Sequence, residues 1–348
     1  MGDFGLTLEL FLVLIALIVI LLLAGVLYQW ASIRSDARRF PPPGRLVDTA
    51  GCRLHIHVSG NGAPPVVFEA GIAATSLSWA LVQPEIANYT QTVSYDRAGL
   101  GWSDPSGSAR DPARVVEELR ALLHRSGVAA PRVLVAHSYG ALIARVYAAR
   151  HSAEIAGLIL LDPVSAAEWS HPSELSRRML RRAILLSRRG ATLARLAVVR
   201  LALNLLAGGA RRLPRLVARA SSGAGVVFTE RIVGEIRKLP RELWPIVQAH
   251  WCDPKCFDAM AQYLEALPAT AVEASQAKSL GEMPLTVLSA GNSSPAQRAE
   301  HERLVCLSTR GKLEIVPDSR HWIQLDRPDI VIRAIQDMLA LRKSECEF

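Results

Sequence analysis

One serine of this 348-residue chain stands in a local sequence that could make it a nucleophile. Ser138 is the centre of Ala136-His137-Ser138-Tyr139-Gly140, with β-favouring residues, 133–135, before it and a helix-like segment, 141–150, after it. A serine at a sharp turn from strand to helix, with small residues two positions away on either side, is typical of a nucleophile elbow. The turn strains the backbone and lifts the hydroxyl clear of the sheet. The sequence therefore predicts that Ser138 is a catalytic nucleophile.

A serine hydroxyl is a weak nucleophile at neutral pH and needs a base beside it. A histidine suits that role because its ordinary pKa, about 6.5, lies close to neutrality. A carboxylate can then fix the tautomer of the histidine and stabilise its charged form. The chain contains nine histidines and 32 acidic residues, so composition alone does not select the partners of Ser138.

The elbow resembles that of the α/β-hydrolase family, although the family usually has glycine where this chain has Ala136. The resemblance extends over about residues 45–341. It includes the string Asp96-Arg97-Ala98-Gly99-Leu100-Gly101-Trp102-Ser103-Asp104, which follows a predicted strand at 92–95. This string is similar to the loop after the fourth strand of small-molecule α/β-hydrolases.

We expect this string to brace the loop that contains it. Asp96 and Arg97 can pair with each other, and the glycines permit tight turns. Trp102 is expected to form part of the wall of a substrate pocket.

The resemblance implies that His321 is the general base, because the family carries this residue directly after the last strand. Here that strand is predicted at 312–316, and the closing helix is predicted at 328–341. The family has its catalytic residues in the chain order serine, acid, histidine, which these positions follow.

The acid departs from the commonest pattern of the family, which places it after the seventh strand. The predicted seventh strand, 284–290, is followed by no carboxylate until Glu300. In some relatives the acid instead follows the sixth strand, where this chain has Asp162. Asp318 is too close to His321 along the chain to reach round its ring easily. We therefore predict that Asp162 is the acid.

Two backbone N–H groups are expected to form an oxyanion hole. In the family one comes from the residue after the nucleophile, which is Tyr139, and the other from the loop after an early strand. That loop follows the predicted strand 65–70, and by position its donor is Ile72. The chain carries Glu69-Ala70-Gly71 where the family commonly has a His-Gly start, so a plain glycine-containing loop is the alternative.

Serine at the elbow disfavours the reactions of haloalkane dehalogenases and epoxide hydrolases, which resemble this sequence but use aspartate there. The remaining chemistry is cleavage of a carboxylic ester or related acyl bond, lipid-like substrates included, through an acyl-enzyme. Aminopeptidases and C–C bond hydrolases of the family share the same triad, and a non-catalytic, ligand-binding member is a further alternative. The mechanism needs no metal or organic cofactor, and no nucleic-acid partner is expected.

Two groups of potential metal ligands fit structural roles better. His55 and His57 alternate with apolar residues in a predicted hairpin strand, which places both on one outward, solvated face. Cys252 and Cys256 have only His250 beside them and lack a fourth ligand at zinc spacing. Five scattered cysteines also do not indicate a disulfide framework.

The elements that must position these residues alternate between strands and helices. This order predicts an α/β fold with a doubly wound, mostly parallel sheet of the α/β-hydrolase type, interrupted by a helical lid. Helix breaks in the lid are expected at Gly208-Gly209, 221–225 and Pro240. The predicted units are an anchor (1–30), a basic, proline-containing linker (31–44), the core (45–163), the lid (164–281) and the rest of the core (282–348).

The N-terminal segment contains an uncharged apolar run, 10–28, that is long enough to cross a hydrocarbon core of about 30 Å. A signal peptide usually has a shorter apolar region after a basic start, whereas Asp3 and Glu9 precede this run. We therefore predict a single transmembrane helix. Three arginines, at 34, 38 and 39, follow it, which favours a cytoplasmic catalytic domain. Because every predicted strand lies after residue 44, we also expect deletion of 1–35 to release an active, soluble domain.

The predicted lid is strongly basic. It contains twelve arginines and no acid between Leu175 and Thr229; the whole chain carries +8, so the rest carries −4. One hypothesis is that this surface faces an anionic membrane, and the other is a solvated arginine-rich face. The apolar run 193–206 is short and contains two arginines, so no second span is expected.

Overall fold

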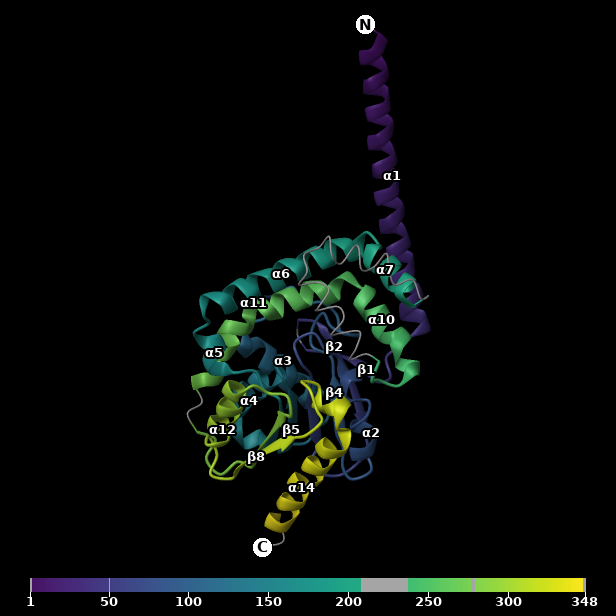
Figure 1. Ribbon diagram of the computed structural model, residues 1–348. Helices are drawn as coiled ribbons and strands as arrows, with labels where there is room; N and C mark the ends of the chain where they lie inside the picture. Colours follow the sequence, from purple (N-terminus) through teal and green to yellow (C-terminus); the bar gives the residue numbers. More distant parts are fainter. Residues whose placement is uncertain (1, 50, 208–236, 277–278, 347–348) are drawn as a thin grey trace.

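The computed structural model describes residues 2–49, 51–207, 237–276 and 279–346 (Figure 1). Its centre is an eight-stranded sheet in the order β1-β2-β4-β3-β5-β6-β7-β8. Strand β2 runs antiparallel to β1 and β4, and the other neighbours pair in parallel. The predicted doubly wound, mostly parallel sheet is therefore confirmed. Its strands are β1 (Arg45–Asp48), β2 (Arg53–Ser59), β3 (Val66–Glu69), β4 (Thr92–Tyr95), β5 (Arg132–His137), β6 (Ile155–Leu161), β7 (Leu285–Ala290) and β8 (Gly311–Val316).

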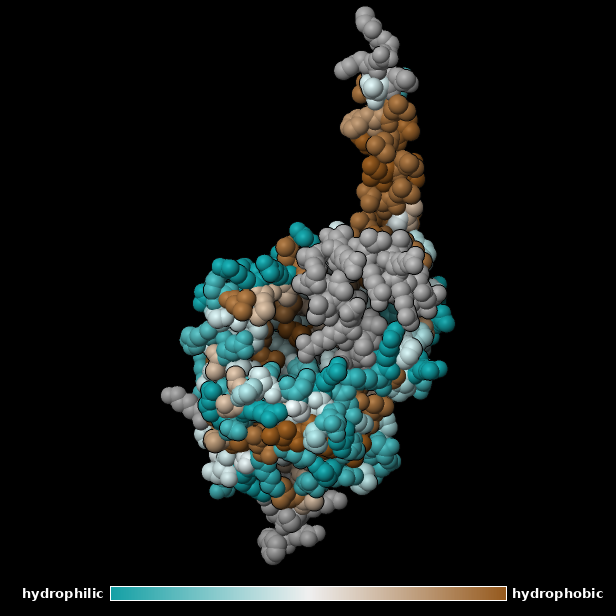
Figure 2. All heavy atoms as spheres, viewed as in Figure 1, coloured by the Kyte–Doolittle hydropathy of each residue, from teal (hydrophilic) through white to brown (hydrophobic). Residues whose placement is uncertain are grey.

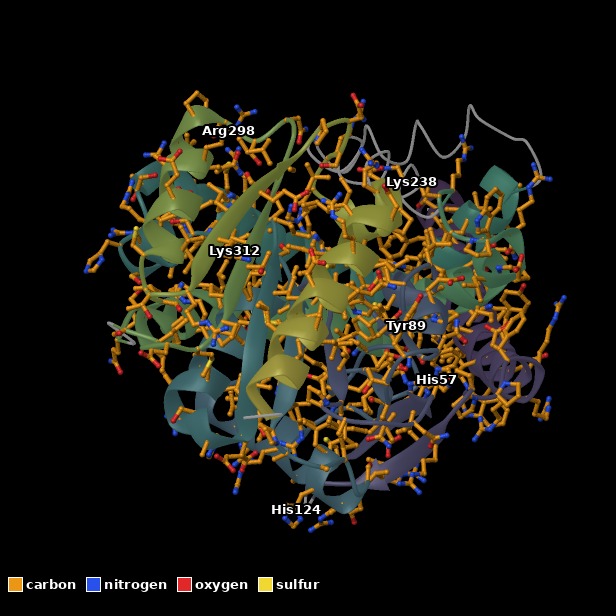
Figure 3. The ribbon with its side chains drawn as sticks, turned by 90° about the horizontal axis from the view of Figure 1, so that it is seen from below. His57, Tyr89, His124, Lys238, Arg298 and Lys312 are labelled. Atoms are coloured by element: carbon orange, nitrogen blue, oxygen red, sulfur yellow. The ribbon has the colours of Figure 1, made fainter. Side chains whose placement is uncertain are left out.

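The central strands are buried on both faces. Along β5, Val133 and Val135 enter one apolar core, whereas Leu134 and Ala136 enter the other. Such strands read as continuous apolar runs because each face is covered by helices. One face is covered by α3 (Pro112–Arg125), α4 (Gly140–Arg150) and α12 (Pro295–Val305), and the other by α2 (Gln83–Ile86), α13 (Ile323–Asp326) and α14 (Pro328–Cys346) (Figures 1 and 3).

The regular elements described within 164–281 are helical. They are α5 (Ala166–Ser170), α6 (Glu174–Arg195), α7 (Val198–Ala207), a short 3-10 turn (Arg241–Leu243), α10 (Trp244–Cys252) and α11 (Pro254–Gln276). In Figure 1 α6, α11 and α10 arch over one end of the sheet. Helix α11 packs on α4 and α6, so this helical insertion shares a core with the sheet. The predicted break at Pro240 precedes the 3-10 turn, and those at Gly208-Gly209 and 221–225 lie outside the described residues.

The N-terminal helix, α1 (Gly2–Arg39), projects from the body of the protein. Its segment Thr7–Arg39 is long and apolar enough to cross a membrane. Apolar side chains are exposed around the helix from Leu8 to Leu27, as the brown shaft in Figure 2 shows. No other helix in the described part of the chain meets these criteria.

The second half of α1 packs against the helical insertion. A Cβ atom at Gly25 would lie 2.7 Å from the carbonyl oxygen of Leu196, so the two backbones approach closely. Gln29 is 2% exposed, and its Nε2 donates to the carbonyl of Cys252 at 2.6 Å. Its Oε1 accepts from Nε of Arg200 at 3.0 Å. Deletion of 1–35, which was expected to release an active, soluble domain, would remove Gly25 and Gln29 from this packing, and its outcome remains a prediction.

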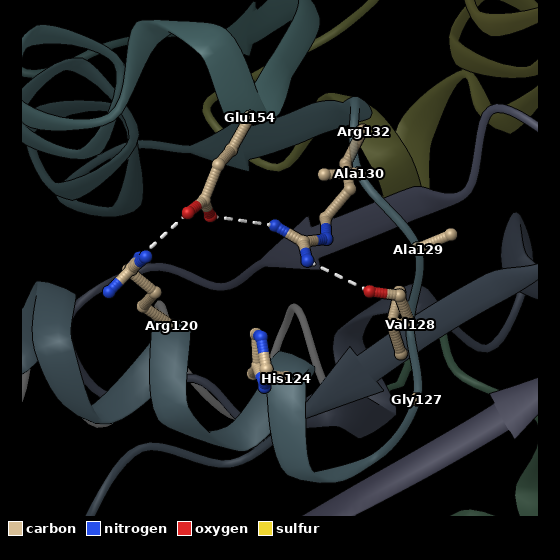
Figure 4. Close-up of a pocket in the computed structure, with 8 residues that line it drawn as sticks. All are labelled: Arg120, His124, Gly127, Val128, Ala129, Ala130, Arg132 and Glu154. Carbon is tan, nitrogen blue, oxygen red and sulfur yellow. Dashed lines mark hydrogen bonds and ion pairs between the residues drawn. The ribbon is translucent and has the colours of Figure 1, made fainter.

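A pocket of about 400 Å³ lies at the end of β5 opposite Ser138, beside Arg132, the first residue of that strand (Figure 4). Glu154 binds Arg132 at 3.0 Å and Arg120 at 2.7 Å there. Burial alone would raise the pKa of Glu154, but hydrogen bonds from Tyr147, Arg120 and Arg132 outweigh it and hold the pKa at about 2. We interpret this ionic cluster as a link between α3, β5 and the start of β6.

Two truncations test whether α1 is part of the folded body. Deletion of 1–23 removes the projecting half, and we expect it to change the melting temperature in detergent by only a few degrees. Deletion of 1–40 also removes the docked half, with the hydrogen bonds of Gln29 to Cys252 and Arg200 and the ion pair of Asp36 with Arg200. These three contacts are worth about 1 kcal/mol each, and their loss should lower the melting temperature on the order of 10 °C for a domain of this size. Equal melting temperatures for the two truncations would contradict this packing.

Candidate active site

Ser138 sits at the turn between β5 and α4. Its φ angle is +55°, a left-handed conformation that is strained for any residue except glycine. A Cβ atom at Gly140 would lie 2.6 Å from the carbonyl oxygen of Ala70, so the turn requires glycine two residues after the serine. The backbone therefore has the form that the sequence predicts for a nucleophile elbow, and Ala136 is accommodated in the buried core.

The structure brings Ser138, His321 and Asp162 into one hydrogen-bonded chain. Nε2 of His321 lies 3.0 Å from Oγ of Ser138, and Nδ1 lies 2.6 Å from Oδ2 of Asp162. Ser138 follows β5, Asp162 follows β6, and His321 lies in the loop after β8. Residues separated by up to 183 positions meet because the carboxyl ends of parallel strands lie at one edge of the sheet.

Asp162 is held as a carboxylate. Burial acts to raise its pKa, but the hydrogen bond and charge of His321 lower it, assisted by donors on β7 and after it. These donors are the backbone N–H of Ala290, at 3.3 Å from Oδ1, and the hydroxyl of Ser293, at 3.0 Å. The net pKa is below the ordinary value. An ionised Asp162 accepts a hydrogen bond from the Nδ1–H group of His321, which leaves Nε2 free to accept one from the hydroxyl of Ser138.

The two other acids considered as partners of His321, Glu300 and Asp318, lie elsewhere. Glu300 pairs with Arg303 at 2.8 Å on α12. Asp318 is exposed and has a φ angle of +58°. Neither forms a hydrogen bond with His321, whose ring nitrogens bind Asp162 and Ser138.

The loop after β3 carries the predicted oxyanion donor Ile72. Among the described residues, neither the backbone N–H of Ile72 nor that of Tyr139 has a hydrogen-bond acceptor. Arg97 holds this loop: its guanidinium binds the Glu69 carboxylate and the carbonyls of Ala70, at 2.6 Å, and Gly71. Free N–H groups on a braced backbone suit the binding of a developing negative charge.

The expected pairing of Asp96 with Arg97 is wrong. Asp96 instead binds Nδ1 of His55 at 2.9 Å and accepts from the backbone N–H groups of Ser76 and Trp102 at 2.7 and 3.1 Å. The solvated position expected for His55 is also wrong, because its side chain is fully buried. The loop after β4 folds back over β2 and covers this histidine, which alternation along one strand cannot reveal. The string still braces its loop, through different partners.

Trp102 belongs to the loop after β4 and packs against α10 of the helical insertion. Its indole Nε1 donates to the carbonyl of Phe40 at 2.9 Å. Its ring contacts His55 and His250, with centroids 4.8 and 4.5 Å away. A place in the wall of the substrate pocket remains a prediction.

His137 is a site residue that the sequence did not identify. Its Nε2 donates to the backbone carbonyl of His321 at 2.7 Å, and its ring packs on Trp322. Burial, followed by the charge of His321, lowers its pKa to about 3, so the ring is neutral at physiological pH. His137 therefore positions the backbone of His321. The sequence shows that His137 directly precedes Ser138, but no local pattern indicates a hydrogen-bond partner 184 residues away.

The comparisons with known proteins agree with this architecture. The model of the "Alpha/beta hydrolase family" matches residues 56–334, and the chain therefore belongs to that family.

Individual curated relatives match a smaller share of the chain than this family model does. The uncharacterized protein YqjL of Bacillus subtilis is 38% identical over 114 residues, 32% of this chain and 45% of the relative. The 2-hydroxymuconate semialdehyde hydrolase of a Pseudomonas species is 30% identical over 125 residues, 35% of this chain and 44% of the relative. The chain thus spans less than half the length of these curated relatives. A solved protein of Pseudomonas aeruginosa, provisionally described as an epoxide hydrolase, has a TM-score of 0.66 at 19% identity, covering 86% of this chain and 96% of that one.

Replacement of His137 tests its positioning role. We expect His137→Phe to lower kcat for a p-nitrophenyl ester about tenfold, the worth of roughly one hydrogen bond, with little change in KM. His137→Gln keeps a side-chain N–H donor and should recover most of the loss. A purely structural role would instead lower the stability of both variants and leave no difference in kcat between them.

Proposed function

We propose that this protein is a membrane-anchored serine hydrolase that cleaves a carboxylic ester or related acyl bond through an acyl-enzyme on Ser138. The observation that carries the proposal is the chain of hydrogen bonds from Ser138 through His321 to Asp162. An activated serine needs a base within hydrogen-bond distance and a third group that orients the base. The family membership supports hydrolytic chemistry in general.

In the first half-reaction, Oγ of Ser138 attacks the acyl carbon while Nε2 of His321 takes its proton. The carbonyl oxygen becomes an oxyanion, for which the backbone N–H groups of Ile72 and Tyr139 are the proposed donors. The carbon–oxygen bond to the leaving group then breaks, and the imidazolium returns the proton to the departing alkoxide. The products are an alcohol and an acyl-Ser138 ester.

In the second half-reaction, His321 takes a proton from water as the water attacks the acyl carbon. The tetrahedral intermediate collapses, and the proton passes to Oγ of Ser138 as the carboxylic acid leaves. Asp162 stabilises the charged imidazolium in both halves without itself taking a proton. Its lowered pKa suits that role because the carboxylate stays ionised throughout.

The reaction of the epoxide hydrolases is disfavoured because this chain has serine where they carry a nucleophilic aspartate. A C–C bond hydrolase is the second candidate, because a 2-hydroxymuconate semialdehyde hydrolase is among the relatives. That enzyme class uses the same serine, acid and histidine. A panel of p-nitrophenyl esters and a vinylogous 1,5-diketone substrate would separate the two candidates.

We further propose that α1 spans the membrane once, with the catalytic domain on the cytoplasmic side, because arginines follow the apolar run. The exposed surface of α6 supports contact of the helical insertion with an anionic membrane. It combines apolar side chains, Leu175, Met179 and Leu185, with exposed arginines such as Arg182 and Arg189. The insertion would then act as a lid at the membrane surface.

A fluorophosphonate probe tests the nucleophile, since it reacts only with an activated serine. We expect the full chain in detergent to be labelled stoichiometrically and Ser138→Ala to remain unlabelled. Labelling that persists in the folded Ser138→Ala variant would contradict the assignment, as would a complete absence of labelling in the native chain.

Replacement of the acid tests the hydrogen-bonded chain. Asp162→Asn should leave the fold intact but favour the wrong imidazole tautomer, and the loss in kcat is expected to be on the order of 10⁴, as in serine proteases. Combining it with His321→Ala should add little, because such residues act as one unit. Glu300→Gln and Asp318→Asn are the matched controls and should stay within a few-fold of the native rate. Near-normal kcat in the Asp162→Asn variant would contradict this assignment and show that another residue is the acid.

A further inference from the structure

A polar cavity of about 350 Å³ lies where α1 meets the helical insertion. It is bounded by the second half of α1, by α7 and by α10, and none of the proposed catalytic residues lines it. Its polar and charged lining includes Ser32, Ser35, Arg39, Arg200, Asn204 and Gln248.

Arg200 supplies a buried positive charge with an unused donor. The residue is 8% exposed; its Nε donates to Gln29 at 3.0 Å and its Nη1 lies 2.7 Å from Oδ2 of Asp36. Its Nη2 is buried and has no hydrogen-bond partner among the described residues. A buried guanidinium N–H without an acceptor is costly, so this nitrogen points to an acceptor that occupies the cavity.

The charges of the lining favour an anion. Asp36, Arg39 and Arg200 are the charged residues that line the cavity, which gives a net charge of +1. Asp36 forms an ion pair with Arg200, although its Oδ2 accepts no hydrogen bond from a described residue. Arg39 is exposed and forms no ion pair with a described residue. A singly charged phosphodiester would balance this lining, and guanidinium groups match the geometry of phosphate oxygens.

The position of the cavity along α1 indicates where the phosphate comes from. Leu27 ends the exposed apolar run, and the two partners of Arg200, Gln29 and Asp36, lie about 3 and 14 Å beyond it along the helix axis. Tyr28 is exposed and directly follows this run, as expected at a membrane–water interface, where aromatic side chains are enriched. Phospholipid headgroups occupy roughly the first 5–8 Å beyond the hydrocarbon core, which is the depth of Arg200 between its two partners. Arg39 lies about 18 Å beyond Leu27 along the helix axis and meets a headgroup there only with its side chain extended back toward the N-terminus of α1.

We propose that this cavity binds the phosphodiester headgroup of a membrane phospholipid, with Arg200 and Arg39 as the phosphate ligands. The proposal rests on the membrane-spanning role proposed for α1 and on no step of the hydrolytic chemistry. A bound headgroup would join α1 to α7 and α10 and so hold the helical insertion against the membrane surface.

The test uses the full chain with Ser138→Ala, so that no lipid is consumed, in a non-ionic detergent. Thermal unfolding is followed while dihexanoyl phosphatidylglycerol, dihexanoylglycerol or inorganic phosphate is added. We expect the melting temperature to rise with the phospholipid, not to rise with the phosphate-free diacylglycerol, and to rise less with inorganic phosphate at equal concentration.

Two neighbouring arginines provide a matched pair of variants. Arg39 lines the cavity and Arg38 does not, yet both are exposed on α1. Loss of one guanidinium–phosphate contact should raise the phospholipid concentration for half-maximal effect about tenfold or more in Arg39→Gln. In Arg38→Gln this concentration should stay within about twofold of the value for the Ser138→Ala chain.

Four results would overturn the proposal: no shift with the phospholipid, equal shifts with dihexanoylglycerol, equal shifts with inorganic phosphate, or equal weakening by the two arginine variants. The proposal that α1 spans the membrane fails on a separate result. A full chain that stays soluble without detergent would show that α1 does not span a membrane. A chain that needs detergent but gives no phospholipid shift loses only the headgroup site.

Discussion

The site depends on two neighbouring strands that end in a left-handed backbone conformation. Ser138 at the end of β5 has φ +55°, and Asp162 at the end of β6 has φ +40°. Each such conformation costs on the order of 1–3 kcal/mol in a residue other than glycine, so the surrounding packing must supply that energy. Here β5 and β6 are fully buried between two apolar cores. A close-packed sheet thus allows a serine and a carboxylate to project toward one histidine.

Buried polar contacts then fix the loops around this edge. Arg97, held by Glu69, binds the carbonyls that lead to Ile72, and His137 binds the carbonyl of His321. Asp96 fixes a further loop through His55. Each contact joins the end of one strand to a loop from another part of the chain. Preorganised groups of this kind need little rearrangement when charge develops, which is the usual source of catalytic stabilisation.

Residues with a strong local signature could be predicted from the sequence. The strand before Ser138 and its glycine two residues later placed this serine at a turn from strand to helix, and the apolar run before Asp162 placed that carboxylate at a strand end. The roles predicted for Asp162 and His321 came from the resemblance to the family. Partners brought together only by folding could not be predicted in this way, and the strand alternation of β2 misplaced His55.

The same limit applies to the packing of the N-terminal helix. Its apolar composition predicted a membrane span, but no periodicity in the sequence indicates that Gln29 is buried against Cys252 and Arg200. Both partners lie in the helical insertion, more than 170 residues away along the chain. The apolar half of α1 and its docked half form one continuous helix, and only the apolar composition of the first half indicated its surroundings.

The most direct measurement is rapid acid quenching of the full chain during hydrolysis of a p-nitrophenyl ester, followed by mass spectrometry of its peptides. A serine mechanism predicts a burst of p-nitrophenol equal to the enzyme concentration and an acyl adduct on the peptide that contains Ser138. Ester hydrolysis accompanied by an adduct on another residue, or by no adduct on that peptide at any quench time, would contradict it.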